Sequence, residues 1–228
     1  MTKAPKFTLR FEKNDDMPDG DDRLFSESFV TNHAPIEKVV TRLLDKLTGN
    51  IIEVASGTGQ HAVNLAQQLP QLTWWPSDIQ DHHIESIAAW QQQSGLSNLK
   101  PPICLDVTQE NWGLEAQDHA PSDNIVAVVC SNLLHIAPWK VSQGLIAGAG
   151  KYLQPNGFLM IYGAFSVDGS HVSQSNVAFD RSLKNQNPEF GVRDTVEIQN
   201  EAEKFGLILS ELTPMPSNNF MLTLQKQF

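Results

Sequence analysis

The sequence predicts an α/β protein built on a doubly wound, mostly parallel sheet of seven strands with an antiparallel last strand. Strand-like runs alternate with amphipathic stretches from residue 36 to residue 205, a pattern typical of strands connected by helices in a parallel sheet. The run Ile125–Val129 is apolar throughout, as expected for a central strand covered on both faces. Two closing strand-like segments, 207–212 and 220–225, are joined by a short Pro- and Asn-containing connection and can pair antiparallel.

The first predicted helix carries its apolar stripe over residues 36–47. Apolar side chains recur there at three- and four-residue steps, which is the pattern of an amphipathic helix. Asn32 can cap this helix and Pro35 suits its first turn, while Gly49 and Asn50 end it.

Strands and helices then alternate up to residue 163. The predicted strands are 51–54, 72–75, 103–105, 124–130 and 158–163, and the predicted helices are 60–69, 81–93 and 138–153. The segment 164–193 is polar and less periodic, and we expect a helix only over 176–185. Asp194 and Glu197 form a capping box for a last helix that reaches Phe205.

The composition limits the classes of function. The net charge is -10 and the sequence pI is near 5.0, which argues against binding of nucleic-acid phosphates because that activity needs clustered Lys and Arg. No apolar run approaches membrane-spanning length, and the N-terminus lacks the apolar core of a signal peptide. Cys104 and Cys130 lie in apolar runs, so we expect both to be buried and reduced. A cytoplasmic protein with neither nucleic-acid nor membrane partners is the expectation.

The chain is long enough for one sizeable α/β domain, which we expect over 23–228 after an irregular acidic segment, 1–22. Residues 15–27 superficially suggest a calcium loop. However, Met17 and Ser26 stand at positions three and twelve, where calcium loops carry oxygen ligands. We therefore expect a solvated loop there and no metal site.

The stretch Ile51–Gln60 carries the clearest functional signal. It passes from a strand through a glycine-rich turn into a helix, an arrangement that points free backbone N–H groups at a ligand. The run from Gly57 to Ala62 fits G-x-G-x-x-A, so a dinucleotide fold is allowed. The longer pattern, Glu53 followed by x-A-x-G-x-G, resembles motif I of the class I S-adenosylmethionine-dependent methyltransferases.

Two carboxylates follow the next predicted strands. Asp78 is placed to accept hydrogen bonds from the ribose hydroxyls of either cofactor, or to act as a turn or helix-capping carboxylate. Acids at the position of Asp106 receive the adenine amine in methyltransferases, although Asp106 can instead cap a turn toward Thr108. A second acid at a strand end favours S-adenosylmethionine over NAD. The residues expected to contact the cofactor are Glu53, Ala55, Ser56, Gly57, Gly59, Gln60, Asp78, Ile79, Asp106, Val107, Ser131 and Asn132.

A closer resemblance covers roughly residues 23–228. The motifs at 53–61, 75–78 and 132–139, with shorter matches elsewhere, resemble a little-characterised methyltransferase-like family catalogued as a domain of unknown function. The family often has an arginine where this chain has Thr31. The resemblance implies the cofactor and the class of reaction, but no acceptor.

The end of the fourth strand supplies the candidate for catalysis. His135 is expected beside the transferred methyl group, where it can act as a base, or it can hydrogen-bond backbone at a helix start. Asn132 is expected to contact the cofactor or to orient the acceptor. The strand end lacks the [DN]-P-P-[YFW] motif with which many enzymes hold a planar nitrogen. Residues expected to shape the acceptor pocket are Tyr162, His171, Ser175, Asn176 and Arg193.

The sequence therefore predicts an S-adenosylmethionine-dependent methyltransferase that acts on a small-molecule acceptor. Two alternatives remain open: an NAD-type oxidoreductase, and a protein that binds S-adenosylmethionine without turnover.

Overall fold

The computed structural model describes residues 21–117 and 119–228. Most of the expected acidic segment, 1–22, and part of the rejected calcium loop, 15–27, lie outside the described residues.

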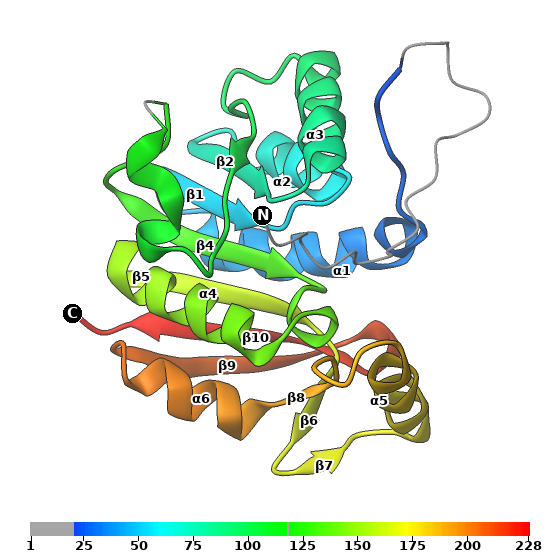
Figure 1. The fold of residues 1–228 in the computed structure, drawn as a ribbon. Helices are drawn as coiled ribbons and strands as arrows, with labels where there is room; N and C mark the ends of the chain where they lie inside the picture. The colour runs from blue at the N-terminus through cyan, green and yellow to red at the C-terminus, as the bar shows by residue number, and fades with distance from the viewer. Residues whose placement is uncertain (1–20, 118) are drawn as a thin grey trace.

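A seven-stranded sheet organises the described chain in the order β3-β2-β1-β4-β5-β10-β9 (Figure 1). The strands are β1 (Gly49–Val54), β2 (Leu72–Asp78), β3 (Ile103–Cys104), β4 (Ile125–Ser131), β5 (Leu153–Gly163), β9 (Leu207–Met215) and β10 (Asn219–Lys226). Strands β1 to β5 run parallel to one another, and β10 lies antiparallel between β5 and β9. The predicted doubly wound sheet with an antiparallel last strand is confirmed.

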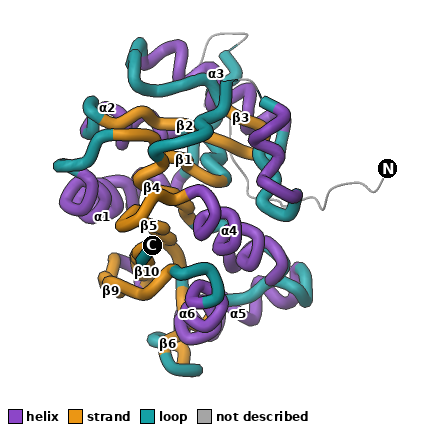
Figure 2. Tube along the Cα trace, turned by 90° about the vertical axis from the view of Figure 1, so that its left-hand side faces the viewer, coloured by secondary structure: helices purple, strands orange, loops and turns teal. Residues whose placement is uncertain are grey.

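Helices cover both faces of this sheet, as Figure 2 shows almost edge-on. They are α1 (Glu27–Leu44), α2 (Gln60–Gln68), α3 (Asp81–Ser94), α4 (Trp139–Tyr152) and α6 (Thr195–Glu203). Successive residues of β1 face opposite sides, so Ile51 joins the core under α1 and α2, whereas Ile52 joins the core under α4 and α6. Both isoleucines are fully buried.

Helix α1 begins earlier than predicted. It starts at Glu27, so Asn32 and Pro35 lie inside it, where the sequence predicted a cap and a first turn. Proline removes the hydrogen bond to the carbonyl four residues earlier, which belongs to Thr31. Because Thr31 is exposed, water can solvate that carbonyl and the helix continues through Pro35.

The segment after β5 forms a small second sheet that the sequence did not predict. Its strands are β6 (Phe165–Val167), β7 (Ser170–His171) and β8 (Arg193–Asp194), in the order β7-β6-β8. Strands of two or three residues are too short to show a period of two, which explains the omission. The helix predicted over 176–185 is confirmed as α5 (Gln174–Gln186), and Asp194 caps α6 by accepting a hydrogen bond from the Val196 N–H.

The prediction of two buried cysteines is half wrong. Cys130 lies fully buried in β4, but Cys104 is exposed. Strand β3 is a two-residue edge strand, so Ile103 faces the core and its neighbour faces solvent.

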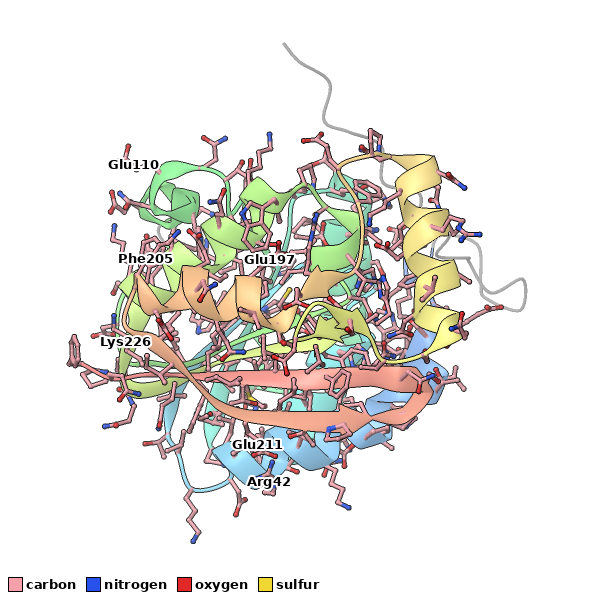
Figure 3. All side chains as sticks on the ribbon, turned by 90° about the horizontal axis from the view of Figure 1, so that it is seen from below. Arg42, Glu110, Glu197, Phe205, Glu211 and Lys226 are labelled. Atoms are coloured by element: carbon pink, nitrogen blue, oxygen red, sulfur yellow. The ribbon has the colours of Figure 1, made fainter. Side chains whose placement is uncertain are left out.

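At the far edge of the sheet, Arg42 of α1 donates to both carboxylate oxygens of Glu211 of β9 at 2.8 Å (Figure 3). Within 21–117 and 119–228, no helix is long and apolar enough to cross a membrane.

Candidate functional site

The turn after β1 has an unusual backbone. Ala55, Gly57 and Gly59 all have positive φ, at 57°, 57° and 88°. A side chain on Gly59 would also meet the backbone of Ile87 in α3, since a Cβ there would lie 3.0 Å from its Cα. Non-glycine residues seldom adopt positive φ, and such positions concentrate at functional sites. The turn thus brings backbone close to whatever occupies the adjoining space.

Asp78 holds this turn from the end of β2. Its Oδ2 accepts the Gly57 N–H at 3.0 Å, and its Oδ1 accepts the N–H groups of Ile79 and Gln80 at 2.8 and 3.1 Å. The Nδ1 of His83 lies 3.1 Å from the same Oδ1. A carboxylate offers about four lone pairs, so only Oδ2 retains acceptor capacity. The interpretation of Asp78 as a turn carboxylate is confirmed, and room for one ligand hydroxyl remains.

Asp106 also serves a turn. Its Oδ1 accepts hydrogen bonds from the backbone N–H and the hydroxyl of Thr108, at 2.9 and 2.7 Å. Partial burial would raise the pKa of Asp106, but the Thr108 hydrogen bonds outweigh it and hold this pKa below its usual value. Asp106 therefore stays ionised. Its second oxygen accepts a hydrogen bond from the Gln109 amide at 3.3 Å, and the residue lines a cavity.

Glu53 is a buried acid near the end of β1. Its side chain is 2% exposed, and its Oε2 accepts a hydrogen bond from the Trp74 indole N–H at 2.9 Å. Burial raises the pKa of Glu53 to about 7, although the hydrogen bond from Trp74 opposes this. Near neutral pH the carboxyl group is thus divided between its two protonation states.

These groups border a cavity of about 340 Å³ at the carboxyl ends of β1, β2, β3 and β4, which we name the strand-end cavity. Ten of the twelve residues expected to contact the cofactor line it, and Gly59 and Gln60 do not. The side-chain oxygen of Gln60 instead accepts the N–H of Ser26 at 2.7 Å. Apolar side chains also line the cavity, among them Ile79, which is 44% exposed, and the buried Val107.

The segment before α1 closes one side of the strand-end cavity. The Leu24 N–H donates to the Ser86 hydroxyl at 2.8 Å, and the Leu24 carbonyl accepts the indole N–H of Trp90 at 3.0 Å. Phe25 packs against the same indole. These contacts fasten Leu24 and Phe25 to α3, and Ser26 and Ser28 line the cavity.

His135 follows β4 in the short helical turn η2 (Leu134–Ile136). Its ring packs edge-on against Phe179, and its side chain is 7% exposed. Burial, assisted by the positive charge of Arg193, lowers the pKa of His135 to about 4, so the ring is neutral at pH 7. Within the part of the chain that the structure describes, neither ring nitrogen makes a hydrogen bond. The imidazole is therefore available to a ligand.

Arg193 fixes this turn from behind. Its guanidinium donates to the carbonyls of Leu134 at 3.1 Å, Ala137 at 2.5 Å and Glu189 at 2.8 Å. The Gly191 N–H adds a hydrogen bond to the His135 carbonyl at 3.0 Å. The position of the imidazole is thus set by the strand β8 region.

A second cavity, of about 390 Å³, adjoins the first, and we name it the side cavity. The two cavities share four lining residues: Ser28, Asn132, His135 and Phe179. Asn132 has a positive φ of 58° and follows β4 directly. The junction between the cavities is therefore formed by the end of β4, α1 and α5.

The residues expected to shape an acceptor pocket divide into two groups. Tyr162, Ser175 and Asn176 line the side cavity. Arg193 and His171 line neither cavity, and this corrects the expectation for both. Arg193 is occupied by backbone carbonyls, and the Nε2 of His171 lies 3.6 Å from the Asp180 carboxylate.

Several residues that line the side cavity were not predicted from the sequence. Those of the side cavity are Ser28, Thr31, Asn32, Ala164, Phe179, Pro216, Ser217, Asn218 and Asn219. One signal was present: Asn32 stands one turn before Ile36, on the apolar stripe of α1, and is 4% exposed. A polar residue on a buried stripe has to meet a polar partner.

The sheet order, the antiparallel β10 and the strand-end cavity together define a class: the chain has the fold of the class I S-adenosylmethionine-dependent methyltransferases. More specifically, it belongs to the family described as "Protein of unknown function (DUF938)", whose model matches residues 23–226.

Solved structures show the same fold at low sequence identity. An O-methyltransferase family protein from Burkholderia thailandensis has a TM-score of 0.71 and 15% identity over 88% of this chain and 58% of that chain. A putative O-methyltransferase from Nostoc punctiforme has a TM-score of 0.71 and 13% identity over the same shares of the two chains. Human N-acetylserotonin methyltransferase, solved in complex with S-adenosylmethionine, has a TM-score of 0.68 and 11% identity over 89% of this chain and 53% of that chain. The described fold thus spans little more than half of these longer chains.

Proposed function

We propose that this protein transfers a methyl group from S-adenosylmethionine to a small-molecule acceptor. The observation that carries the proposal is the junction of the strand-end and side cavities at Asn132 and His135. Two substrates that fill adjoining cavities meet at the residues shared by both. A donor in the strand-end cavity and an acceptor in the side cavity would be aligned in this way, and alignment is the main contribution of an enzyme to an in-line transfer.

The lining of the strand-end cavity fits S-adenosylmethionine. Glu53 suits the amino group of the donor, and the free lone pair on Asp78 Oδ2 suits one ribose hydroxyl. Asp106 suits the adenine amine, because the Asp106 carboxylate is ionised and the residue lines the cavity. Ile79 and Val107 supply apolar surface for the adenine ring.

Charge favours this donor over NAD. The described lining of the strand-end cavity contains Glu53, Asp78 and Asp106 but neither Lys nor Arg. A dinucleotide would place the two negative charges of its pyrophosphate among these acids without a counter-charge, which is unfavourable at short range. S-adenosylmethionine carries a positive sulfonium, and its interaction with the same acids is attractive.

When bound, S-adenosylmethionine supplies a methyl group on a cationic sulfur, and the electrons of the broken sulfur–carbon bond return to that sulfur. The residues at the junction orient the acceptor and exclude water. If the acceptor loses a proton, the neutral His135 ring can receive it, because both ring nitrogens lack partners among the described residues. Arg193 keeps the ring in place through the carbonyls of Leu134 and Ala137.

A methyl-acceptor screen tests the proposal. The full chain is incubated with methyl-labelled S-adenosylmethionine and fractionated cell extract, and label is followed in low-molecular-weight fractions. We expect label to transfer with the wild type and to disappear with Asp78→Ala. Binding of S-adenosylmethionine without transfer to any fraction would support instead a protein that holds this ligand without turnover.

A further inference from the structure

The side cavity has an uncharged but strongly polar lining. Its fourteen described lining residues include five asparagines and three serines, and none is Asp, Glu, Lys or Arg. A charged ligand would lose its hydration there without gaining a counter-ion, which is costly in a partly buried site. A purely apolar ligand would leave the amides and hydroxyls without partners.

Two buried groups at the base of this cavity define its polarity further. The Tyr162 hydroxyl accepts a hydrogen bond from the Asn219 amide at 2.9 Å, and the nearby Asn32 side chain opposes the rise that burial causes in the pKa of Tyr162. The hydroxyl proton of Tyr162 has no acceptor among the hydrogen bonds of the described residues, so it is left to donate. Tyr162 and Asn32 are both 4% exposed.

Asn32 presents the complementary group. Its Oδ1 is buried and has no hydrogen-bond partner among the described residues. Since buried polar atoms are nearly always paired in folded proteins, an unpaired acceptor on a residue that lines a cavity points to a ligand donor. The free acceptor of Asn32 and the free donor of Tyr162 belong to two residues that line the same cavity, and the two side chains are near enough for Asn32 to affect the pKa of Tyr162.

The rim of the cavity is held in a strained conformation. Ser217 and Asn218 both have positive φ, at 61° and 57°. Asn218 is tied to α5, since its carbonyl accepts the Asn176 amide at 3.0 Å and its own amide reaches the Ser175 hydroxyl at 3.3 Å. Strain that surrounding contacts maintain is typical of a binding site.

We propose that the side cavity binds an uncharged acceptor molecule through an amide group, a carboxamide or a lactam, whose N–H meets Asn32 Oδ1 and whose carbonyl meets the Tyr162 hydroxyl. Such a group offers a donor and an acceptor side by side, which matches the pair on the cavity wall. The inference rests on the proposed methyl transfer, because it names the class of acceptor at that same site.

Titration of simple probes onto the full chain tests this inference. Benzamide and 2-pyrrolidinone carry the amide, while benzoate and benzylamine replace it with an anion and a cation of similar size. Each is titrated by calorimetry with and without S-adenosylhomocysteine. We expect the amides to bind at least tenfold more tightly than the two charged probes. Equal or tighter binding of a charged probe, or no binding of either amide, would overturn the proposal.

Two variants locate the binding. Asn32→Leu and Tyr162→Phe should each weaken amide binding at least tenfold and leave the affinity for S-adenosylhomocysteine unchanged. Tyr162→Phe preserves the ring and so remains informative if Asn32→Leu fails to fold. The controls are Asn64→Leu and Tyr152→Phe, whose side chains bond Glu37 and the Asn111 carbonyl and line neither cavity. Amide affinity that survives both test variants would overturn the assignment.

The S-adenosylhomocysteine titration separates the two proposals. If S-adenosylhomocysteine binds and the amides do not, the methyl-transfer proposal stands and the amide-acceptor inference fails. If S-adenosylhomocysteine itself does not bind, the methyl-transfer proposal fails, whatever the amides do.

Discussion

The carboxylate of Asp78 accepts the backbone N–H of Gly57 at 3.0 Å, and so the residue that ends β2 fixes the glycine turn that follows β1. The same carboxylate accepts two N–H groups at the start of the connection to α3. One side chain therefore sets the backbone on two sides of the strand-end cavity. Removal of the Asp78 carboxylate should therefore alter the shape of the strand-end cavity and also lower the stability of the fold.

Asp78→Ala should abolish measurable binding of S-adenosylmethionine and lower stability. The variant leaves one buried and two partly buried N–H groups without their acceptor, which costs on the order of 3 kcal/mol. Where that cost falls on the bound state, it corresponds to about a hundredfold in affinity. Calorimetry measures the binding and denaturant unfolding measures the stability. Asp81→Ala, an exposed acid in the first turn of α3, is the control and should change neither. Wild-type affinity in Asp78→Ala would remove this residue from the site.

His135→Ala should separate binding from transfer. The ring lies at the junction of the two cavities, so its loss should leave the affinity for S-adenosylmethionine within a few-fold while transfer falls by about 10². The pKa of His135 is about 4, so the wild-type rate should not show loss of this base until the pH falls toward that value. Label transfer to the acceptor fraction is the assay, and His171→Ala, which alters neither cavity wall, is the control. A transfer rate equal to wild type would exclude a catalytic role for His135.

Glu53→Gln should change how stability depends on pH. Burial raises the pKa of Glu53 to about 7, so the folded state holds a proton that the unfolded state releases above the ordinary value of 4.5. The stability that Glu53 contributes is thus complete below pH 4.5 and is lost as the pH rises through 7. The amide keeps an acceptor for Trp74 but does not ionise. The unfolding free energy of the variant relative to wild type should increase by up to about 3 kcal/mol from pH 4 to pH 8.

Denaturant unfolding at several pH values measures this difference. Glu85→Gln replaces an exposed glutamate of α3 and should give a curve parallel to wild type. A parallel curve for Glu53→Gln as well would mean that Glu53 titrates in the folded protein as it does in the unfolded chain.

Arg193→Met should impair methyl transfer without abolishing the binding of S-adenosylmethionine in the strand-end cavity. The guanidinium bonds three backbone carbonyls around His135, so the variant should lose about 2 kcal/mol of unfolding free energy and some of the alignment of the imidazole. We expect transfer to fall more than affinity for S-adenosylmethionine. Arg42→Met removes an exposed ion pair with Glu211 and should cost less than about 1 kcal/mol. An equal effect of the two substitutions on stability would contradict a structural role for Arg193.

The strand-end cavity could be predicted from the sequence because its residues follow strands. The carboxyl ends of parallel strands meet at one edge of a sheet, so Asp78 and Asp106 could be placed beside the glycine turn from their positions alone. For each acid the sequence predicted turn capping only as an alternative to cofactor contact, and it did not specify which backbone N–H groups the carboxylates accept. That detail depends on local angles, which residue patterns do not specify.

The side cavity could not be predicted in the same way. Its wall is assembled from α1, the ends of β4 and β5, α5 and the turn before β10, segments that no short motif connects. The first turns of α1 were missed for the same reason: Ser28, Thr31 and Asn32 face a cavity, so they leave no apolar period. Apolar periodicity predicts which face of a helix packs against a core. It does not predict a helix face that lines a polar pocket.

Calorimetric titration of the wild-type chain with S-adenosylmethionine, S-adenosylhomocysteine and NAD is the most direct test of the proposed function. We predict saturable one-site binding of the first two ligands and none of NAD, because the strand-end cavity offers acids and no described Lys or Arg. Binding of NAD without binding of either adenosyl ligand would contradict the proposal and favour an oxidoreductase.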